Sequence, residues 1–177
     1  WVSYKPQARM LNTQVINVPT TLDDRGYHLN AGTLRQAIQD ARAQGFNPAK
    51  LILNYPNNPT GLTIPENELK DIAHVCREEN IFIISDEIYS LIDFNQEYES
   101  ISTFAPDNTA ISTGLSKHLS LGGWRLGVGM IPKSHKGLFD KLCVLASEIW
   151  SCVPAPIQYS CISAYTSEPE IEHHIQS

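Results

Sequence analysis

Five polar side chains that could do chemistry fall next to apolar runs of the sequence. Asn58 follows one such run, Asp86 and Tyr89 close a second, Lys117 follows a third, and Arg125 opens a fourth. If these runs are strands of an open α/β sheet, the residues that follow them lie at the edge where such sheets bind ligands. An amide, a carboxylate, a phenol, an amine and a guanidinium at one edge predict an anion and cofactor site.

Each of these side chains also has a simpler interpretation when it is considered alone. Asp86 follows the apolar run 81–84, so its carboxylate is expected to be poorly solvated and to need a cationic or hydrogen-bonding partner. The simpler alternative is that the carboxylate caps the turn that follows. Lys117 is predicted either as a desolvated, nucleophilic amine or as a surface lysine. Arg125 fits a phosphate site or a structural ion pair, and Tyr89 could pack in the core. The site hypothesis therefore depends on the whole set.

The elements that must position these residues alternate between β-rich runs and helical patterns. Strands are predicted at 13–19, 50–56, 81–89, 108–116 and 126–132, and helices at 31–44, 63–80, 134–150 and 155–167. The run 81–89 is so apolar that it predicts a central parallel strand covered on both faces. We therefore expect an α/β fold with a three-layer, doubly wound, mostly parallel sheet.

The last predicted strand departs from the parallel pattern. About nine residues separate the strand that ends near Ser116 from the strand that starts near Leu126, whereas a parallel crossover needs a dozen or more. We expect this strand to be antiparallel.

Two local signals mark the ends of predicted helices. Thr63 and Glu66 form a capping-box pattern at the start of the helix predicted at 63–80, and Gly45 stands where a C′ glycine belongs, after the helix predicted at 31–44.

Composition excludes several classes of protein. The 177 residues are 42% apolar and 18% charged, which is typical of one globular domain, and the formal charge of −6 argues against a nucleic-acid or anionic-membrane surface. No apolar run approaches the ~20 residues that span a bilayer. The four cysteines have no CxxC spacing, so we expect reduced, mostly buried thiols and a cytoplasmic protein.

Three segments together resemble the signature segments of fold-type I pyridoxal-phosphate enzymes, specifically the class I/II aminotransferases. They are "NNPTG" (57–61), "SDEIY" (85–89) and "GLSKHLSLGGWRLG" (114–127), in the family's order and spacing. The resemblance covers essentially the whole chain and implies that residues 1–177 are the cofactor-binding large domain. The N-terminal arm, the glycine-rich phosphate loop and the C-terminal small domain are not in these residues, so the chain alone is expected to be inactive.

The resemblance implies a role for each residue of the set. Lys117 would form a Schiff base with the cofactor and later carry the proton between the substrate Cα and the cofactor. Asp86 would pair with the pyridine nitrogen and keep it protonated, so that the ring can accept electrons. Asn58 and Tyr89 would hydrogen-bond the phenolate oxygen, and Arg125 would bind the phosphate.

The family pattern adds further expectations. It implies a cis peptide bond before Pro59, with Gly61 supplying the tight turn, and an aromatic residue that stacks on the cofactor ring. The stretch "WVSY" resembles the tail of the segment that carries this aromatic residue, which makes Trp1 the candidate.

The chain departs from the family three positions before the lysine, where many members have a phosphate-binding serine and this chain has Gly114. Ser116 or Ser112 could take its place. His118 follows the lysine directly, and as its immediate neighbour it is expected to point away from the site. No role is assigned to it.

The function implied is amino transfer between an amino acid and a 2-oxo acid, in a homodimer whose sites lie at the subunit interface. Three alternatives remain open at this stage: another pyridoxal-phosphate reaction such as that of a β-lyase, decarboxylase or synthase, a cofactor-sensing domain of a regulator, or a catalytically silent dimerisation module. Thr60 favours transfer over one group of synthases, which usually carry a different residue there.

Overall fold

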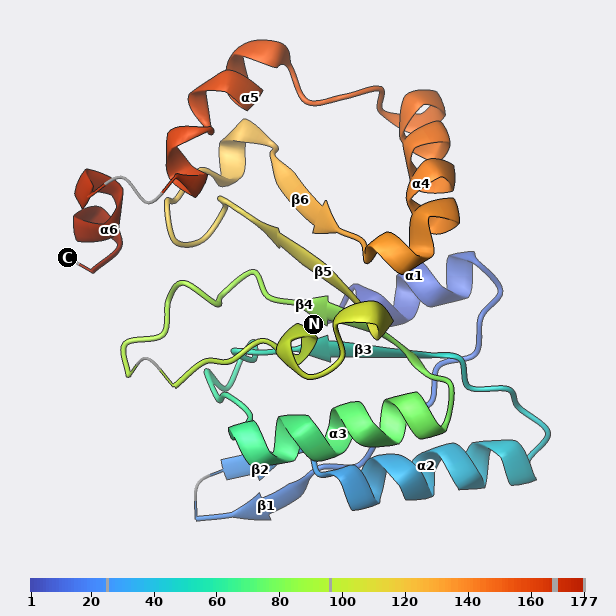
Figure 1. Ribbon diagram of the computed structural model, residues 1–177. Helices are drawn as coiled ribbons and strands as arrows, with labels where there is room; N and C mark the ends of the chain where they lie inside the picture. The colour runs from blue at the N-terminus through green and yellow to red at the C-terminus, as the bar shows by residue number, and fades with distance from the viewer. Residues whose placement is uncertain (25, 96, 167–168, 177) are drawn as a thin grey trace.

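A central sheet of four strands runs through the part of the chain that the computed structural model describes, which is residues 1–24, 26–95, 97–166 and 169–176 (Figure 1). The strand order is β3 (Lys50–Asn54), β4 (Phe82–Asp86), β5 (Thr109–Gly114) and β6 (Gly127–Met130). The first three strands are parallel and β6 is antiparallel to β5. The α/β class, the mostly parallel sheet and the antiparallel last strand are therefore confirmed.

The register of the sheet aligns the carboxyl ends of the three parallel strands. Asn54 of β3 pairs with Asp86 of β4, and Asp86 pairs with Ser112 of β5. On the other side of β5, Gly114 pairs with Gly127, where β6 begins. The sheet therefore brings to one edge the residues that the sequence places at the ends of separate runs.

Two helices cover one face of the sheet, as Figure 1 shows, and α1 (Tyr4–Met10) lies behind the strands. Helix α2 (Ala31–Ala43) begins where the side chain of Asn30 accepts the Thr33 backbone N–H at 2.8 Å. Helix α3 (Glu66–Glu78) lies beside it. Their apolar faces pack with the inward side chains of β3 and β4 in the main core, which includes the fully buried Leu69, Ile72 and Ile83.

The predicted capping box is wrong, although the helix that it introduces is present. Helix α3 begins at Glu66, and Pro65 occupies the capping position without any side-chain cap. The proline ring holds φ at −58°, which suits a helix start but leaves Thr63 outside the capping position. Glu66 instead pairs with Lys70 one turn later, at 2.6 Å.

The strand predicted at 13–19 is also wrong. This segment pairs with no strand in the described part of the chain, and its Val18 packs against the main core. A separate antiparallel pair follows it, β1 (Thr21–Asp23) with β2 (Gly26–His28). An alternating pattern fits any extended segment with one buried face, so the sequence could not distinguish this segment from a strand of the sheet.

The later elements are shorter than predicted. The strand predicted at 81–89 ends at Asp86, and the helix predicted at 155–167 is α5 (Ala155–Ser160) followed by a 3-10 turn, Ser163–Tyr165. The last residue of that prediction, 167, lies outside the described residues. Helix α4 (Lys136–Ile149) follows β6, and α6 (Pro169–Gln176) ends the described chain.

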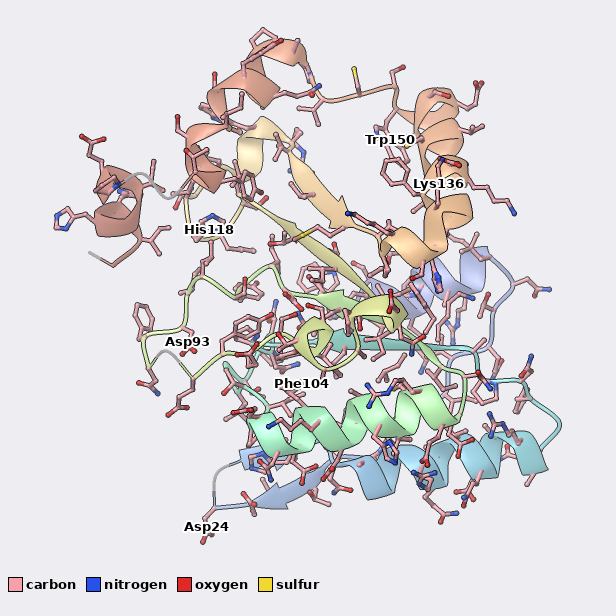
Figure 2. All side chains as sticks on the ribbon, in the orientation of Figure 1. Asp24, Asp93, Phe104, His118, Lys136 and Trp150 are labelled. Atoms are coloured by element: carbon pink, nitrogen blue, oxygen red, sulfur yellow. The ribbon has the colours of Figure 1, made fainter. Side chains whose placement is uncertain are left out.

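Helix α4 explains why the cysteine prediction is only half right. It has no buried residue, and Figure 2 shows it, between the labelled Lys136 and Trp150, set apart from the helices on the other face. Cys143 of this helix is therefore exposed, and so is Cys152 in the segment that follows it, whereas Cys76 and Cys161 are buried; all four are free thiols. Burial raises the pKa of the Cys76 thiol to about 12. Among the described helices, none has the length and apolarity needed to cross a bilayer.

Candidate active site

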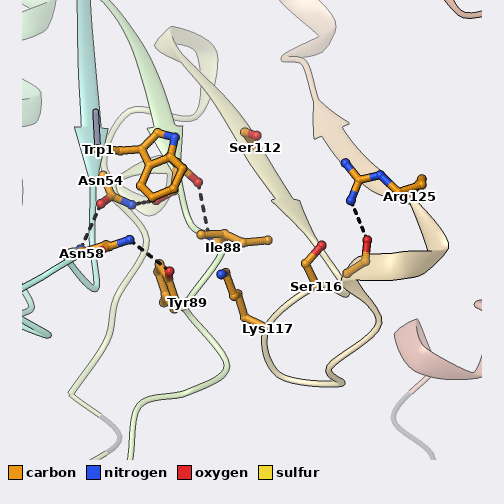
Figure 3. Close-up of a pocket in the computed structure, with 11 residues that line it drawn as sticks. Trp1, Asn54, Asn58, Ile88, Tyr89, Ser112, Ser116, Lys117 and Arg125 are labelled. Atoms are coloured by element: carbon orange, nitrogen blue, oxygen red, sulfur yellow. Dashed lines mark hydrogen bonds between the residues drawn. The ribbon is translucent and has the colours of Figure 1, made fainter. Parts of the chain in front are cut away.

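One pocket of about 470 Å³ lies at the carboxyl ends of the parallel strands (Figure 3). Its volume is in the range of small-molecule sites. It is lined by every residue predicted for the site, together with three others, Asn54, Ile88 and Gly122; the full lining is Trp1, Asn54, Asn58, Asp86, Ile88, Tyr89, Ser112, Ser116, Lys117, Gly122 and Arg125. The structure thus brings the whole predicted set to one place.

The carboxylate and the amine reach this pocket from different elements. Asp86 is the last residue of β4 and is half-buried, whereas Lys117 lies in the turn after β5. The Lys117 Nζ is 5.3 Å from the centroid of the Tyr89 ring, and Figure 3 shows its amine pointing toward that side of the pocket. Lys117 is exposed, so the desolvation expected for its amine is not provided by the described residues.

Asp86 has a hydrogen-bond partner that sequence reasoning missed. Tyr4 Oη, at the start of α1, donates to Asp86 Oδ2, and the Ile88 N–H donates to Oδ1 at 3.4 Å. The expected partner of the carboxylate and the expected turn cap are therefore both present. Burial, reinforced by this contact with Asp86, raises the pKa of the Tyr4 phenol above its ordinary value. No local sequence pattern links Tyr4 to a residue 82 positions away.

The segment after β3 holds the amide of the set against the phenol. Asn58 Nδ2 donates to Tyr89 Oη at 3.2 Å. The predicted cis bond between Asn58 and Pro59 is present, and Gly61 has a φ of +71° in the following turn, as expected. The segment turns sharply after β3 and leaves Asn58 at the pocket, beside Tyr89 (Figure 3).

Asn54 is a second residue that the sequence analysis missed. Its Nδ2 donates to the Asp86 carbonyl oxygen at 3.2 Å, and its Oδ1 accepts the Asn58 backbone N–H at 3.1 Å. One amide therefore joins the end of β4 to the loop that carries Asn58. Its pairing with Asp86 at the ends of β3 and β4 is visible only in the structure, so no signal in the sequence identified it.

The cationic side of the pocket lies beyond β5. Arg125 adopts a left-handed backbone conformation with a φ of +58°, its side chain is exposed, and its Nη1 donates to the Gly122 carbonyl at 2.5 Å. Figure 3 shows Ser116 between Lys117 and Arg125, with Ser112 farther back on β5. Hydroxyl and guanidinium donors are thus near one another, as an anion site requires.

The structure gives a physical reason for Gly114, the departure from the family pattern. A Cβ built at this residue would lie 3.0 Å from the Leu126 carbonyl oxygen and 3.3 Å from the Gly127 Cα. A side chain at this position would therefore require the chain at the start of β6 to shift by a few tenths of an ångström. Ser112 and Ser116 line the pocket on either side of it.

The two remaining predicted features differ in their relation to the pocket. Trp1 lines the pocket and is 59% exposed, and Figure 3 shows its indole beside Asn54. His118 is buried and does not line the pocket, which agrees with the absence of an assigned role. Its Nε2 has no hydrogen-bond partner among the residues that the structure describes, and burial lowers its pKa.

The donor set fits the groups of pyridoxal phosphate. That cofactor carries an aldehyde, a pyridine nitrogen, a phenolic oxygen and a phosphate, and the pocket offers an amine, a carboxylate, an amide–phenol pair and a guanidinium with hydroxyls. An indole at the rim adds a flat apolar surface for a ring.

Comparison with known proteins agrees with this assignment. The family model described as "Aminotransferase class I and II" matches residues 1–177, and the enzymes of this family depend on pyridoxal phosphate. The probable N-acetyl-LL-diaminopimelate aminotransferase of Bacillus subtilis is 37% identical over 130 residues, which are 73% of this chain and 31% of that protein. The aspartate aminotransferase of Bacillus sp. (strain YM-2) is 32% identical over 169 residues, which are 93% of this chain and 41% of that protein.

Solved structures give the same result. The aspartate aminotransferase from Thermus thermophilus with maleate is 25% identical and superposes with a TM-score of 0.87, covering 99% of this chain and 44% of that one. The chain thus spans less than half the length of these relatives. Its fold, its pocket and its sequence place it in the class I and II aminotransferase family.

Proposed function

We propose that this chain supplies the cofactor site of a pyridoxal-phosphate-dependent aminotransferase, which moves an amino group between an amino acid and a 2-oxo acid. The observation that carries the proposal is the meeting of Asp86, from the end of β4, and Lys117, from the turn after β5, in one pocket. The relatives described above are all named aminotransferases, which supports transfer over the lyase, decarboxylase, synthase, sensing and silent alternatives.

Bound pyridoxal phosphate supplies an electron sink for the bond that breaks at the substrate Cα. In the proposal, Lys117 would hold the cofactor covalently as a Schiff base, and its amine, once freed, would carry the proton between the substrate Cα and the cofactor. Asp86 holds a proton on the ring nitrogen through a charge-assisted hydrogen bond. Asn58 and Tyr89, already bonded to each other, donate to the phenolic oxygen.

The remaining roles follow from position in the pocket. Arg125 binds the phosphate with its fork of donors, and Ser116 adds a hydroxyl, with Ser112 as the further candidate in place of the family serine. Trp1 covers one face of the ring by stacking. The exposure of Lys117 is consistent with a site that needs further protein to exclude water from the amine.

The proposal extends to the assembly. Residues 1–177 form most of the cofactor-binding large domain, and the active protein is a homodimer in the cytoplasm. The coverage of the relatives supports the first point, because this chain matches only 31% and 41% of two of them. The net charge of −6 supports a protein without nucleic-acid or membrane partners.

The substrate is proposed only as a class. The relatives are named for different amino donors, aspartate and an N-acetylated diaminopimelate, so their names do not select one. A panel of amino acids added to the cofactor-loaded protein, followed by absorbance, identifies the donors that convert the cofactor to its amine form.

Borohydride reduction followed by peptide mapping tests the proposal directly. The absorbance band of the bound cofactor should disappear on reduction, and the adduct should map to Lys117. Lys117→Ala should abolish the adduct, whereas Lys133→Ala, which removes a lysine that does not line the pocket, should not. An adduct on another lysine would overturn the assignment.

A further inference from the structure

Glu87 lies in the chain between two residues of the proposed site, Asp86 and Tyr89, but it does not line the pocket itself. We propose that Glu87 is a positioning residue, whose buried carboxylate fixes the turn that carries Asp86 and Tyr89 to the segment 98–102. The inference rests on the proposed function, because the two side chains that Glu87 positions are those assigned to the cofactor. Glu87 acts on them through hydrogen bonds to other parts of the chain.

The side chain of Glu87 is an acidic group inside the protein. It is 6% exposed, and it is the only acidic side chain among the buried residues of the described chain. A carboxylate in such a place costs free energy unless it is paired or hydrogen-bonded. No ion pair reaches Glu87 from the residues that the structure describes, so hydrogen bonds must stabilise it.

Hydroxyl groups from two segments surround this carboxylate. Glu87 Oε1 accepts a hydrogen bond from Ser85 Oγ of β4 at 2.8 Å, and another from Ser100 Oγ at 2.7 Å. A third hydroxyl, Tyr98 Oη, is buried and has no partner of ordinary geometry among the described residues. Burial first, and then the neighbouring Glu87, raise the pKa of Tyr98, so this phenol stays protonated beside the carboxylate.

The segment that supplies Ser100 is itself held in place. Ser100 caps a 3-10 turn by accepting the Ser102 N–H at 3.2 Å. The next residue, Ile101, is fully buried, and its N–H donates to Tyr55 Oη at 2.6 Å. Tyr55 follows β3 at the start of the loop that carries Asn58. One buried segment therefore contacts both of the turns that carry pocket residues.

The backbone of Glu87 links these contacts to the pocket. Its N–H donates to the Ser112 carbonyl of β5 at 2.8 Å, and its carbonyl accepts the Ser90 N–H at 3.0 Å. Successive side chains of a strand point to opposite faces, so Glu87 points into the protein where Asp86 points to the pocket. Movement of the carboxylate would therefore displace Asp86 and Tyr89 together.

Ser100→Ala tests the bond between the two segments without activity and without cofactor. It removes one donor to the Glu87 carboxylate and leaves the pocket residues unchanged. In the cofactor-free protein, we expect the Ser90 amide hydrogen to exchange with solvent about tenfold faster, since a hydrogen bond to a charged group has about that worth. Exchange at the unmodified rate would overturn the inference.

Thr103→Ala is the matched control for this experiment. Thr103 lies in the same 3-10 turn, and its hydroxyl donates to Glu99 at 2.6 Å, away from the Glu87 carboxylate. The Ser90 amide should exchange at the unmodified rate in this variant. Equal acceleration in Thr103→Ala and Ser100→Ala would mean that any change in the turn loosens the site, and would refute a specific role for Glu87.

Cofactor affinity gives the second measurement, with a conservative variant as the rescue. In the intact protein, Glu87→Met keeps the length of the side chain and removes both acceptor oxygens, so it should weaken pyridoxal phosphate binding about tenfold. Glu87→Gln keeps an oxygen that can accept the same hydroxyls and should remain within about threefold of the unmodified affinity. Equal losses in the two variants would show that the hydrogen bonds are not what matters, and would overturn the inference.

A loss of stability alone is distinguished by a variant elsewhere in the core. Ile72→Ala removes a fully buried side chain of α3, so it should lower stability to urea and keep the cofactor affinity of the folded protein. If Glu87→Met behaves in the same way, Glu87 has a structural role only and the proposal is refuted. If Glu87→Met does not fold, the amide exchange of Ser100→Ala decides. Failure of the unmodified protein to bind the cofactor through Lys117 would refute the proposed function and leave the exchange result standing.

Discussion

Removal of the Asn54 side chain tests whether the strand ends are tied together as the structure indicates. Asn54→Ala deletes the donor to the Asp86 carbonyl, at 3.2 Å, and the acceptor of the Asn58 N–H, at 3.1 Å. Each such bond contributes about 0.5–1.5 kcal/mol net, so the two together stabilise the fold by about 1–3 kcal/mol. Because Asn54 is only half-buried, water should recover part of that loss.

The effect on cofactor binding should be separable from the effect on stability. Asp86 and Asn58 would lose their fixed relative position, and a binding loss of about 1.4 kcal/mol would weaken cofactor affinity about tenfold. Urea unfolding measures the first quantity, and an absorbance titration with pyridoxal phosphate measures the second.

Asn108→Ala is a matched control at the other end of β4. Asn108 Nδ2 donates to the Ile81 carbonyl at 2.6 Å, and its side chain is half-buried like that of Asn54. This variant should lose about 0.5–1.5 kcal/mol of stability, which is what one such bond contributes, and it should keep its cofactor affinity. The reasoning fails if both variants weaken cofactor binding equally, or if Asn54→Ala leaves the affinity unchanged.

Three further outcomes are expected. Gly114→Ser should lower the free energy of unfolding by about 1–3 kcal/mol in urea denaturation, because its Cβ meets the Leu126 carbonyl; an equally stable variant would contradict the close approach of the strands. A maleimide probe should label Cys152 in the native protein and leave Cys76 unlabelled until unfolding, as mass spectrometry would show. Burial lowers the pKa of His118 in the folded protein. The contribution of this residue to the free energy of unfolding should therefore be complete above about pH 6.5 and decline as the pH falls below that value. His118→Gln should remove this part of the pH dependence of unfolding.

Local pattern was enough for most of the fold. The apolar spacing around Leu34 and Leu69 predicted the helices α2 and α3, and short apolar runs predicted the strands β3, β4 and β5. The direction of β6 follows from the shortness of its connection, which leaves no room for a parallel crossover. The pattern failed at 13–19 because an extended segment is a strand only if it pairs with a neighbouring strand. It failed at Thr63 because Pro65 occupies the capping position of α3.

The members of the site were also visible in the sequence, because their residue types and spacing carry the family pattern. Their partners were not. Tyr4 and Asn54 act through contacts across 82 and 32 positions, and no local pattern encodes a contact at that separation.

The sequence by itself determined the elements, their order and the chemistry available at the strand ends, because these depend on side-chain type and short-range periodicity. Tertiary structure alone decided that Tyr4 reaches Asp86, that Asn54 joins two strand ends, and that Lys117 stays exposed. Those facts depend on how twisted strands and helices pack in three dimensions, where the final position of each group is set by all of its neighbours at once.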